Sequence, residues 1–252
     1  MTFVDTNTSY GHWPFALLPK QTLGQFEAHL QEHQIERALV SRLETIFLPD
    51  PDRTNRDHIR ACKRLDNLSP VPVLNLANRG CLQNLEEYRR MTEIKAVKLY
   101  PNFHNYSLRS TRVSRLTEYL AAKEIRLIIN MRMMDERHQY HGLKIKGVST
   151  KQIISYAKRF SEFPFLCTGL YQPEMLAIAE QCPQVRMDLS FADSHNLING
   201  LIETINPEHL YFGSHAPLMV TKANTYKLET ASIPTTLKIR IARDNAKAFF
   251  KL

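Results

Sequence analysis

The chain has 252 residues, 43% of them hydrophobic and 23% charged, a balance that excludes a disordered or fibrous protein and suits one large globular domain. Its 33 basic and 25 acidic residues give a net charge of +8, but the basic residues are dispersed, so we expect no nucleic-acid partner and a pocket for a small anion stays compatible. No apolar run is long enough to cross a bilayer, and we expect no membrane association.

The cysteines and the N-terminus indicate a cytoplasmic protein. The cysteines, Cys62, Cys81, Cys167 and Cys182, show no Cys-x-x-Cys spacing and are few for this length, so we expect reduced thiols. The N-terminus has no basic stretch followed by an apolar segment, so we expect no signal peptide.

Short apolar runs alternate with amphipathic segments along the whole chain, which is typical of strand–helix units around a parallel sheet. We predict strands that start near residues 3–6, 37–41, 71–76, 96–100, 126–131, 165–168, 185–189 and 210–213. No linker or shift in composition divides the chain, so residues 1–252 are predicted to form one domain. The fold class we expect is α/β, a single (β/α)8 TIM barrel, with an open doubly wound sheet as the alternative.

Two helical segments carry clear apolar stripes. After Thr111, the residues Val113, Leu116 and Leu120 share one face, which we expect to pack on the sheet. The last segment carries a similar stripe, formed by Ile239, Ala242, Ala246 and Phe249. This final helix is predicted to close the barrel.

Four short motifs occur in order along the chain, and three of them follow predicted strands, where the active sites of such barrels lie. They are Asp-x-Asn-x-x-x-Gly-x-Trp-Pro-Phe at 5–15, Lys-Leu-Tyr-Pro at 98–101, Gly-Ser-His-Ala-Pro at 213–217 and Asp-Asn-Ala-Lys at 244–247. In order and spacing the chain resembles the amidohydrolase-related superfamily. The resemblance implies a TIM barrel and metal-assisted hydrolysis, decarboxylation or hydration of small molecules, with a His-x-His pair on the first strand and an Asp on the eighth.

The chain departs from that pattern at the metal ligands. Asn7 and Ser9 stand at the positions of the His-x-His pair, Asn130 at that of a fifth-strand His, and His215 at that of the eighth-strand Asp. No His follows the sixth strand near Thr168. Neutral amide and hydroxyl oxygens are poor substitutes for imidazole, so we predict a degenerate metal site and assign no metal ligand.

Histidines in the predicted loops on the same face could build a different site. They are His104, His138, His141, His195 and His215. A divalent metal such as zinc would require three of them to converge, and their separations follow no metal motif. No cofactor is therefore assigned from the sequence.

Lys98 interrupts an apolar strand and alternates with Val97 and Leu99, so its side chain is predicted to point to the opposite face, into the barrel. An ammonium there requires a carboxylate or a ligand anion beside it, and Asp188 is the candidate partner. We interpret Lys98 and Asp188 as catalytic candidates, and a structural buried ion pair is the alternative.

A dense polar cluster follows the fifth strand and is suited to gripping a carboxylate or phosphate through guanidinium contacts. A network of salt bridges within the loop is the alternative. With the polar residues on neighbouring strands and loops, the predicted substrate-binding set is Asn7, His104, Asn130, Arg132, Asp135, Arg137 and His138.

His215 replaces a metal ligand of the family with a group that titrates near neutrality, and it is the sharpest candidate for general acid–base catalysis. The alternative is a hydrogen bond from His215 to Asp5 or Asn7 that holds a vestigial site together.

Two functions therefore stand side by side. The first is an amidohydrolase-like hydrolase or lyase acting on a small, anionic molecule, with His215 as acid–base, Lys98 and Arg132 holding the anion and Asp188 orienting Lys98. The second is a catalytically inactive barrel that binds a small ligand or a protein partner. A homo-oligomer is compatible with both, and the sequence names neither substrate nor reaction.

Overall fold

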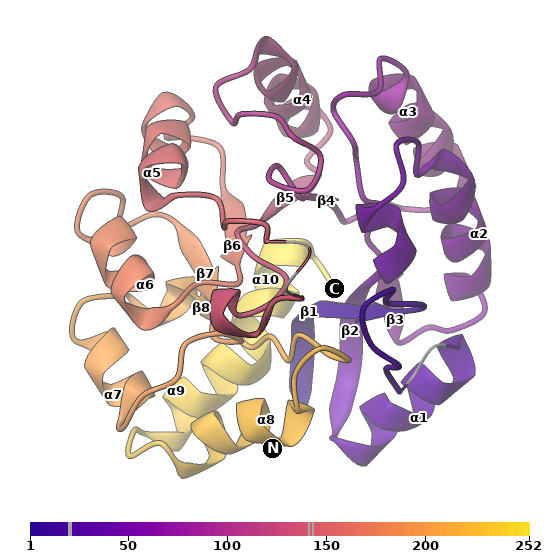
Figure 1. Cartoon of the computed structure of the whole chain (residues 1–252). Helices are drawn as coiled ribbons and strands as arrows, with labels where there is room; N and C mark the ends of the chain where they lie inside the picture. Colours follow the sequence, from indigo (N-terminus) through magenta and orange to yellow (C-terminus); the bar gives the residue numbers. More distant parts are fainter. Residues whose placement is uncertain (20–21, 141, 143) are drawn as a thin grey trace.

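The structure is a computed structural model that describes residues 1–19, 22–140, 142 and 144–252, and it is a parallel β barrel surrounded by helices (Figure 1). Its strands are β1 (Phe3–Tyr10), β2 (Ile35–Arg42), β3 (Leu68–Pro70), β4 (Ala96–Leu99), β5 (Arg126–Asn130), β6 (Phe165–Thr168), β7 (Arg186–Asp188) and β8 (Leu210–Tyr211). Its α-helices are α1 (Leu23–Glu32), α2 (Asp52–Cys62), α3 (Cys81–Met91), α4 (Thr111–Ala122), α5 (Thr150–Arg159), α6 (Gln172–Ala179), α7 (Leu197–Ile202), α8 (Thr221–Thr230), α9 (Thr235–Ile239) and α10 (Asn245–Phe250). The predicted (β/α)8 barrel is confirmed.

Two strand sets close on each other to make the barrel. Strands β1 to β3 pair in parallel, and so do β4 to β8. On one side Val73 forms a parallel bridge with Lys98, and on the other the Thr6 amide donates to the Phe212 carbonyl at 3.1 Å. The eight strands therefore form a continuous wall around the barrel axis.

The third strand differs from the prediction of residues 71–76. The regular ladder is β3, and beyond it only Val73 pairs as a single bridge among the described residues. Pro70 and Pro72 carry no amide hydrogen, so this stretch cannot donate the consecutive bonds of a regular strand. Its apolar run still lines the wall at that place.

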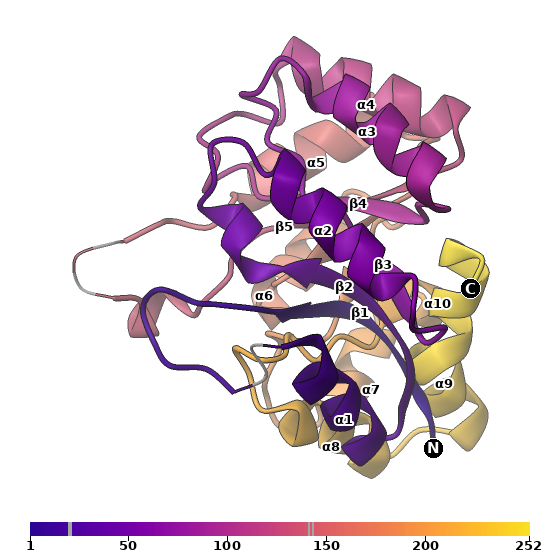
Figure 2. The ribbon, with the colours of Figure 1, turned by 90° about the vertical axis from the view of Figure 1, so that its right-hand side faces the viewer.

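The helices pack as their apolar stripes predict, with one shift near the C-terminus. In α4, Val113, Leu116 and Leu120 are fully buried. In the last segment a π-helical turn at Arg240–Asp244 changes the phase, so Ile241 is buried and Ile239 is only partly buried. Figure 2 shows α10 at the end of the barrel opposite the β5–α5 loop, where it closes the N-terminal end of the strands.

The barrel interior is layered along its axis. An apolar layer at the N-terminal end contains Val4, Leu39, Val71, Ala96, Ile128, Leu166, Tyr211, Ala246, Phe249 and Phe250. Two residues further along β4, β5 and β6, the same inward face carries Lys98, Asn130 and Thr168, all buried. The alternation of the strands thus places polar side chains in the middle of the barrel.

The cysteines and the helices were also the subject of expectations. Cys62, Cys81, Cys167 and Cys182 are all free. Burial raises the pKa of each of these thiols. None of the helices in the described ranges combines the length and the apolar character that a membrane span requires.

Candidate functional site

Four buried side chains, three from strands and one from the segment after β8, meet inside the barrel, and we call Asn7, Lys98, Asp188 and His215 the central polar group. The Lys98 Nζ donates to Asn7 Oδ1 at 2.7 Å. Asn7 Nδ2 lies 2.9 Å from Asp188 Oδ2 and 3.1 Å from His215 Nδ1. Asn7 on β1 is therefore the hub that connects β4, β7 and the segment after β8.

The direction of each bond follows from Lys98. An ammonium can only donate, so the amide oxygen of Asn7 faces Lys98 and its NH2 faces Asp188 and His215. His215 Nδ1 must then accept, and its Nε2–H donates to the Met133 carbonyl at 2.8 Å. Both ring nitrogens of His215 are engaged in the neutral form, and burial lowers the pKa of His215 to about 4.

Lys98 lies inside the barrel, as the strand alternation predicts, but its hydrogen-bond partner is an amide. Burial lowers the pKa of Lys98 to about 8, and the charges of Asp188 and, more weakly, Asp5 oppose that shift. No direct salt bridge joins Lys98 to Asp188 in the described part of the chain, because Asn7 stands between them. The predicted pairing is therefore indirect.

Two buried carboxyl groups flank this arrangement. Burial raises the pKa of Asp5 to about 6, although Asp5 Oδ1 accepts from the amides of Asn7 and Ser214 at 3.1 and 3.0 Å. Burial also raises the pKa of Asp188, whose Oδ1 accepts from the Gly169 amide at 3.0 Å. The interior thus holds one ammonium and two acids that resist ionisation.

Two members of this site were absent from the predicted set. Asp5 lies two residues before Asn7, and Ser190, whose Oγ lies 3.3 Å from Asn7 Nδ2, lies two residues after Asp188. The period of two along a strand was the signal that could have found Ser190, whereas a register shift between Asp5 and Thr8 interrupts that period on β1. Asn130, which was predicted, donates to Thr168 Oγ1 at 3.1 Å, while its buried Oδ1 has no hydrogen-bond partner among the described residues.

Arg132 is committed to a salt bridge outside the central polar group. Its guanidinium donates to both carboxylate oxygens of Glu174 at 2.5 Å and to the Gly169 carbonyl at 2.7 Å. It also lies 4.0 Å from the centroid of the Tyr171 ring. The salt bridge joins the start of the β5–α5 loop to helix α6, so it is not the network within the loop that the sequence left as the alternative.

The remaining predicted binding residues lie apart from the central polar group. Arg137 pairs with Asp135 at 2.7 Å, and this bond holds the pKa of the Asp135 carboxyl well below its usual range. His138 is exposed beside them. His104 is buried in the loop after β4, and burial lowers its pKa. None of the hydrogen bonds recorded for the described residues joins these four to the barrel interior.

The residues at the barrel centre do not fit a metal ion. An ammonium occupies the Asn7 oxygen and both nitrogens of His215 are engaged, so neither side chain has a donor atom to give. Within the described chain, the one group with metal-ligand spacing is His29, Glu32 and His33 on and just after α1. Of the loop histidines, His141 lies outside the described residues, and the others form no metal-ligand group with His215.

An aromatic cover closes the barrel mouth. Trp13 is 3% exposed and packs on Phe15 and Phe47, with ring centroids 5.6 and 5.2 Å apart. Phe15 stacks on Tyr140 of the β5–α5 loop at 5.5 Å. In Figure 1 this loop lies across the middle of the barrel. A small apolar cavity within this cover is lined by Trp13, Phe15, Phe103, Met134, Gln139, Tyr140 and Ile145.

No family model matches the chain, and no curated protein matches it. Solved structures do. The 5-carboxyvanillate decarboxylase of Sphingomonas paucimobilis superposes with a TM-score of 0.78 at 12% identity, over 100% of this chain and 99% of the other. That of Novosphingobium aromaticivorans, complexed with manganese and 4-hydroxy-3-methoxy-5-nitrobenzoic acid, gives 0.79 at 10% identity, over 100% and 96%. An amidohydrolase II structure gives 0.77 at 16% identity, over all of both chains.

These likenesses establish the fold. The chain has the TIM-barrel architecture of amidohydrolase-type proteins, along its whole length and theirs. The resemblance that the motifs predict is thus confirmed at the level of the fold, while the chemistry depends on the site.

Proposed function

We propose that this barrel is an enzyme that acts on a small carboxylic acid at the C-terminal ends of its strands, and that the reaction is removal of the carboxyl group. The observation that carries the proposal is the buried ammonium of Lys98, which is bonded to a neutral amide instead of a carboxylate. Asp5 and Asp188, the two buried acids near it, have raised pKa values, and neither of them forms a salt bridge with Lys98 within the described residues.

A substrate carboxylate is the partner that this ammonium lacks. Burying an ammonium costs on the order of several kcal/mol, as for other buried ions, unless an anion or good hydrogen bonds compensate it. An incoming carboxylate at Lys98 would supply that compensation, and the unpartnered Oδ1 of Asn130 offers an acceptor for a hydroxyl on the same molecule.

The carboxyl group of Asp188 is the proton source in this proposal. The bond from the substrate carbon to its carboxylate breaks, the electron pair stays on that carbon, and carbon dioxide leaves. The carbon takes the proton of Asp188, which is left ionised and regains a proton from water. Its raised pKa keeps the carboxyl protonated more readily than an exposed aspartate, and Lys98 beside it stabilises the transient carboxylate.

The aromatic cover suits an aromatic acid. Trp13, Phe15 and Phe103 line a small apolar cavity at the mouth, and their ring faces would pack on a flat substrate once the cover opens. The similar solved structures include enzymes named for decarboxylation of an aromatic acid, which agrees with this substrate class.

His215 is a positioning residue in this scheme. Its neutral ring fixes the amide of Asn7, and so the places of Lys98 and Asp188. Because both ring nitrogens are already bonded, a His215→Asn variant should lower kcat while leaving the shape of the pH–rate profile unchanged. Loss of one limb of the profile would instead identify His215 as the acid–base group.

The test is turnover of hydroxybenzoic acids, with 5-carboxyvanillate included, followed by chromatography of the decarboxylated product. Lys98→Met and Asp188→Asn should each lower kcat/KM by at least about 100-fold while circular dichroism shows a folded barrel. Lys123→Met, which removes an exposed lysine at the end of α4, is the matched control and should stay within about twofold of wild type.

Two results would contradict the proposal. Wild-type turnover in folded Lys98→Met would remove the ammonium from the mechanism. Saturable binding of these acids, seen as a raised Tm, without any product would mean a binding barrel with no catalysis.

A further inference from the structure

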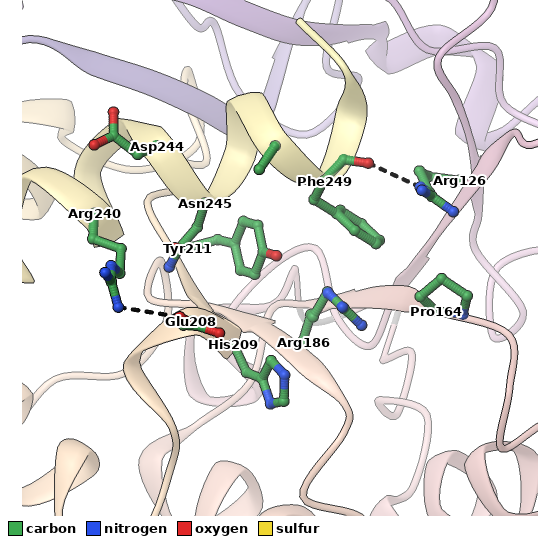
Figure 3. Close-up of a pocket in the computed structure, with 11 residues that line it drawn as sticks. Arg126, Pro164, Arg186, Glu208, His209, Tyr211, Arg240, Asp244, Asn245 and Phe249 are labelled. Atoms are coloured by element: carbon green, nitrogen blue, oxygen red, sulfur yellow. Dashed lines mark hydrogen bonds and ion pairs between the residues drawn. The ribbon is translucent and has the colours of Figure 1, made fainter.

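The N-terminal end of the barrel carries a second cavity, far along the axis from the central polar group. It has a volume of about 470 Å³, within the range of small-molecule sites. The starts of β5, β7 and β8 and the helix α10 surround it, and Figure 3 shows Arg126, Arg186, Tyr211 and Phe249 facing it. Nothing in the proposed reaction uses these residues.

The two arginines reach this cavity because of the strand period. Arg126 lies two residues before Ile128, and Arg186 two residues before Asp188, on the faces that turn into the barrel. Each arginine is the first residue of its strand, so its side chain lies at the N-terminal end of the barrel, outside the apolar layer. Both guanidiniums therefore lie at the rim of this cavity, which Tyr211 of β8 also lines.

The guanidiniums lie over one aromatic ring. The Cζ of Arg126 is 5.0 Å from the centroid of Phe249, and that of Arg186 is 4.6 Å from the same centroid. Arg126 Nε donates to the Phe249 carbonyl at 2.8 Å. This packing holds two positive charges close together.

No carboxylate neutralises this pair within the described chain. The acids near the cavity are engaged elsewhere, Glu208 with Arg240 at 3.1 Å and Asp244 with Arg243 at 2.8 Å. Burial and the charge of Arg186 lower the pKa of Arg126, as expected for like charges held together. An anion placed between them would relieve that repulsion.

Tyr211 adds a neutral donor to the same place. It is buried, and burial raises its pKa to about 12 against the opposing effect of Arg186, so the phenol keeps its proton. The site thus offers two forked guanidiniums and one hydroxyl. Two positive charges are matched by a dianion, and donors from three sides suit the three terminal oxygens of a phosphate monoester, which carries twice the charge of a single carboxylate.

We propose that this cavity binds a small phosphorylated molecule, whose phosphate lies between Arg126, Arg186 and Tyr211. The cavity is much larger than a phosphate group, so the ligand carries an organic part as well. The proposal is independent of the reaction at the other end of the barrel.

The experiment is calorimetric titration of the whole protein, at low salt, with inorganic phosphate and with ribose 5-phosphate. We expect saturable binding, tighter for the sugar phosphate. Arg126→Met and Arg186→Met should each weaken it by about tenfold or more. Arg240→Met removes the same charge from the same rim, but that charge is already paired with Glu208, so its effect should stay within about twofold.

Several outcomes would overturn the site. The first is the absence of saturable binding. The second is a loss of affinity in Arg240→Met equal to that in Arg126→Met, which would indicate diffuse electrostatic attraction. The third is binding of succinate with the same affinity, which would mean that the ligand is a dicarboxylate and no phosphate. Should a methionine variant fail to fold by circular dichroism, Arg186→Lys keeps the charge and removes the fork, and weakened binding is still expected. Lys98→Met should bind phosphate as wild type does, which separates this inference from the proposed function.

Discussion

His215 donates a hydrogen bond from Nε2 to the main-chain carbonyl of Met133, at 2.8 Å. The bond ties the segment after β8 to the start of the β5–α5 loop, whose later residue Tyr140 stacks on Phe15 over the mouth. The side chain that completes the central polar group therefore also holds its cover in place. Opening the mouth to a substrate requires this loop to move, and the bond between His215 and Met133 is the contact that such a movement breaks.

We predict that His215 makes the fold sensitive to acid. The pKa of His215 is about 4 in the folded state against 6.5 for an unperturbed side chain, so between these values the unfolded chain binds the extra proton and stability falls as the pH falls. The loss is on the order of 3 kcal/mol for this group. His215→Asn, which tolerates the positive φ of 53° at this position, should flatten the decline in urea unfolding between pH 6.5 and 4.

Asp5 supplies the internal control for that measurement. Its folded-state pKa is raised to about 6, so its contribution has the opposite sign: it is present at low pH and is lost as the pH rises through 6. Asp5→Asn should therefore make the acid decline steeper. Unfolding curves that keep the wild-type pH dependence in both variants would contradict the assigned environments.

The salt bridge between Arg132 and Glu174 should contribute far more to the free energy of unfolding than the nearby pair of Arg137 and Asp135. Arg132 has a side chain only 4% exposed, so Glu174→Gln leaves a buried guanidinium without its carboxylate and should lower the free energy of unfolding by about 2–4 kcal/mol. Asp135→Asn breaks the pair with the exposed Arg137 and should change it by less than about 0.5 kcal/mol. Equal effects in chemical denaturation would contradict this difference.

Trp13 is the single tryptophan and provides a reporter at the mouth. It is part of the aromatic cover and lines the small apolar cavity there, so an aromatic acid that binds at the mouth should quench or shift its emission in a saturable way. The effect should weaken in Lys98→Met, which removes the carboxylate's partner, and persist in Lys123→Met. If the emission spectrum does not change when a ligand is known to be bound, the ligand binds elsewhere than at the mouth.

Gly213 is required because the side chains of Asp188 and Asn7 pack closely against its Cα. A Cβ there would lie 2.4 Å from Asp188 Oδ2 and 3.1 Å from Asn7 Cβ, so Gly213→Ala should displace Asp188 and destabilise the protein by about 1–3 kcal/mol. Gly24 in α1 has nothing within 4 Å of its Cβ position, and Gly24→Ala should be neutral or slightly stabilising. Thermal unfolding of the pair checks this, and tolerance of alanine at both positions would count against a tightly packed centre.

Sequence patterns predicted the barrel well because the signals are local. Alternation along β4 placed Lys98 inside, and the α4 stripe placed Leu116 on the sheet, each from its own neighbours in the chain. The predictions were less accurate at two places. Two prolines interrupt the ladder of the third strand, and a π-helical turn shifts the buried face of the last helical segment to Ile241. The inference to a family resemblance rested on four motifs in register and holds for the fold.

The sequence alone determined that Lys98 on β4 faces into the barrel, because a period of two along a regular strand needs no knowledge of the partner strand. Only the tertiary structure showed that Asn7 separates Lys98 from Asp188, that Arg132 belongs to Glu174, and that two arginines share the opposite end of the barrel. Those pairings join residues far apart in the chain, and they depend on strand register and on the distances between side chains, which no local pattern encodes.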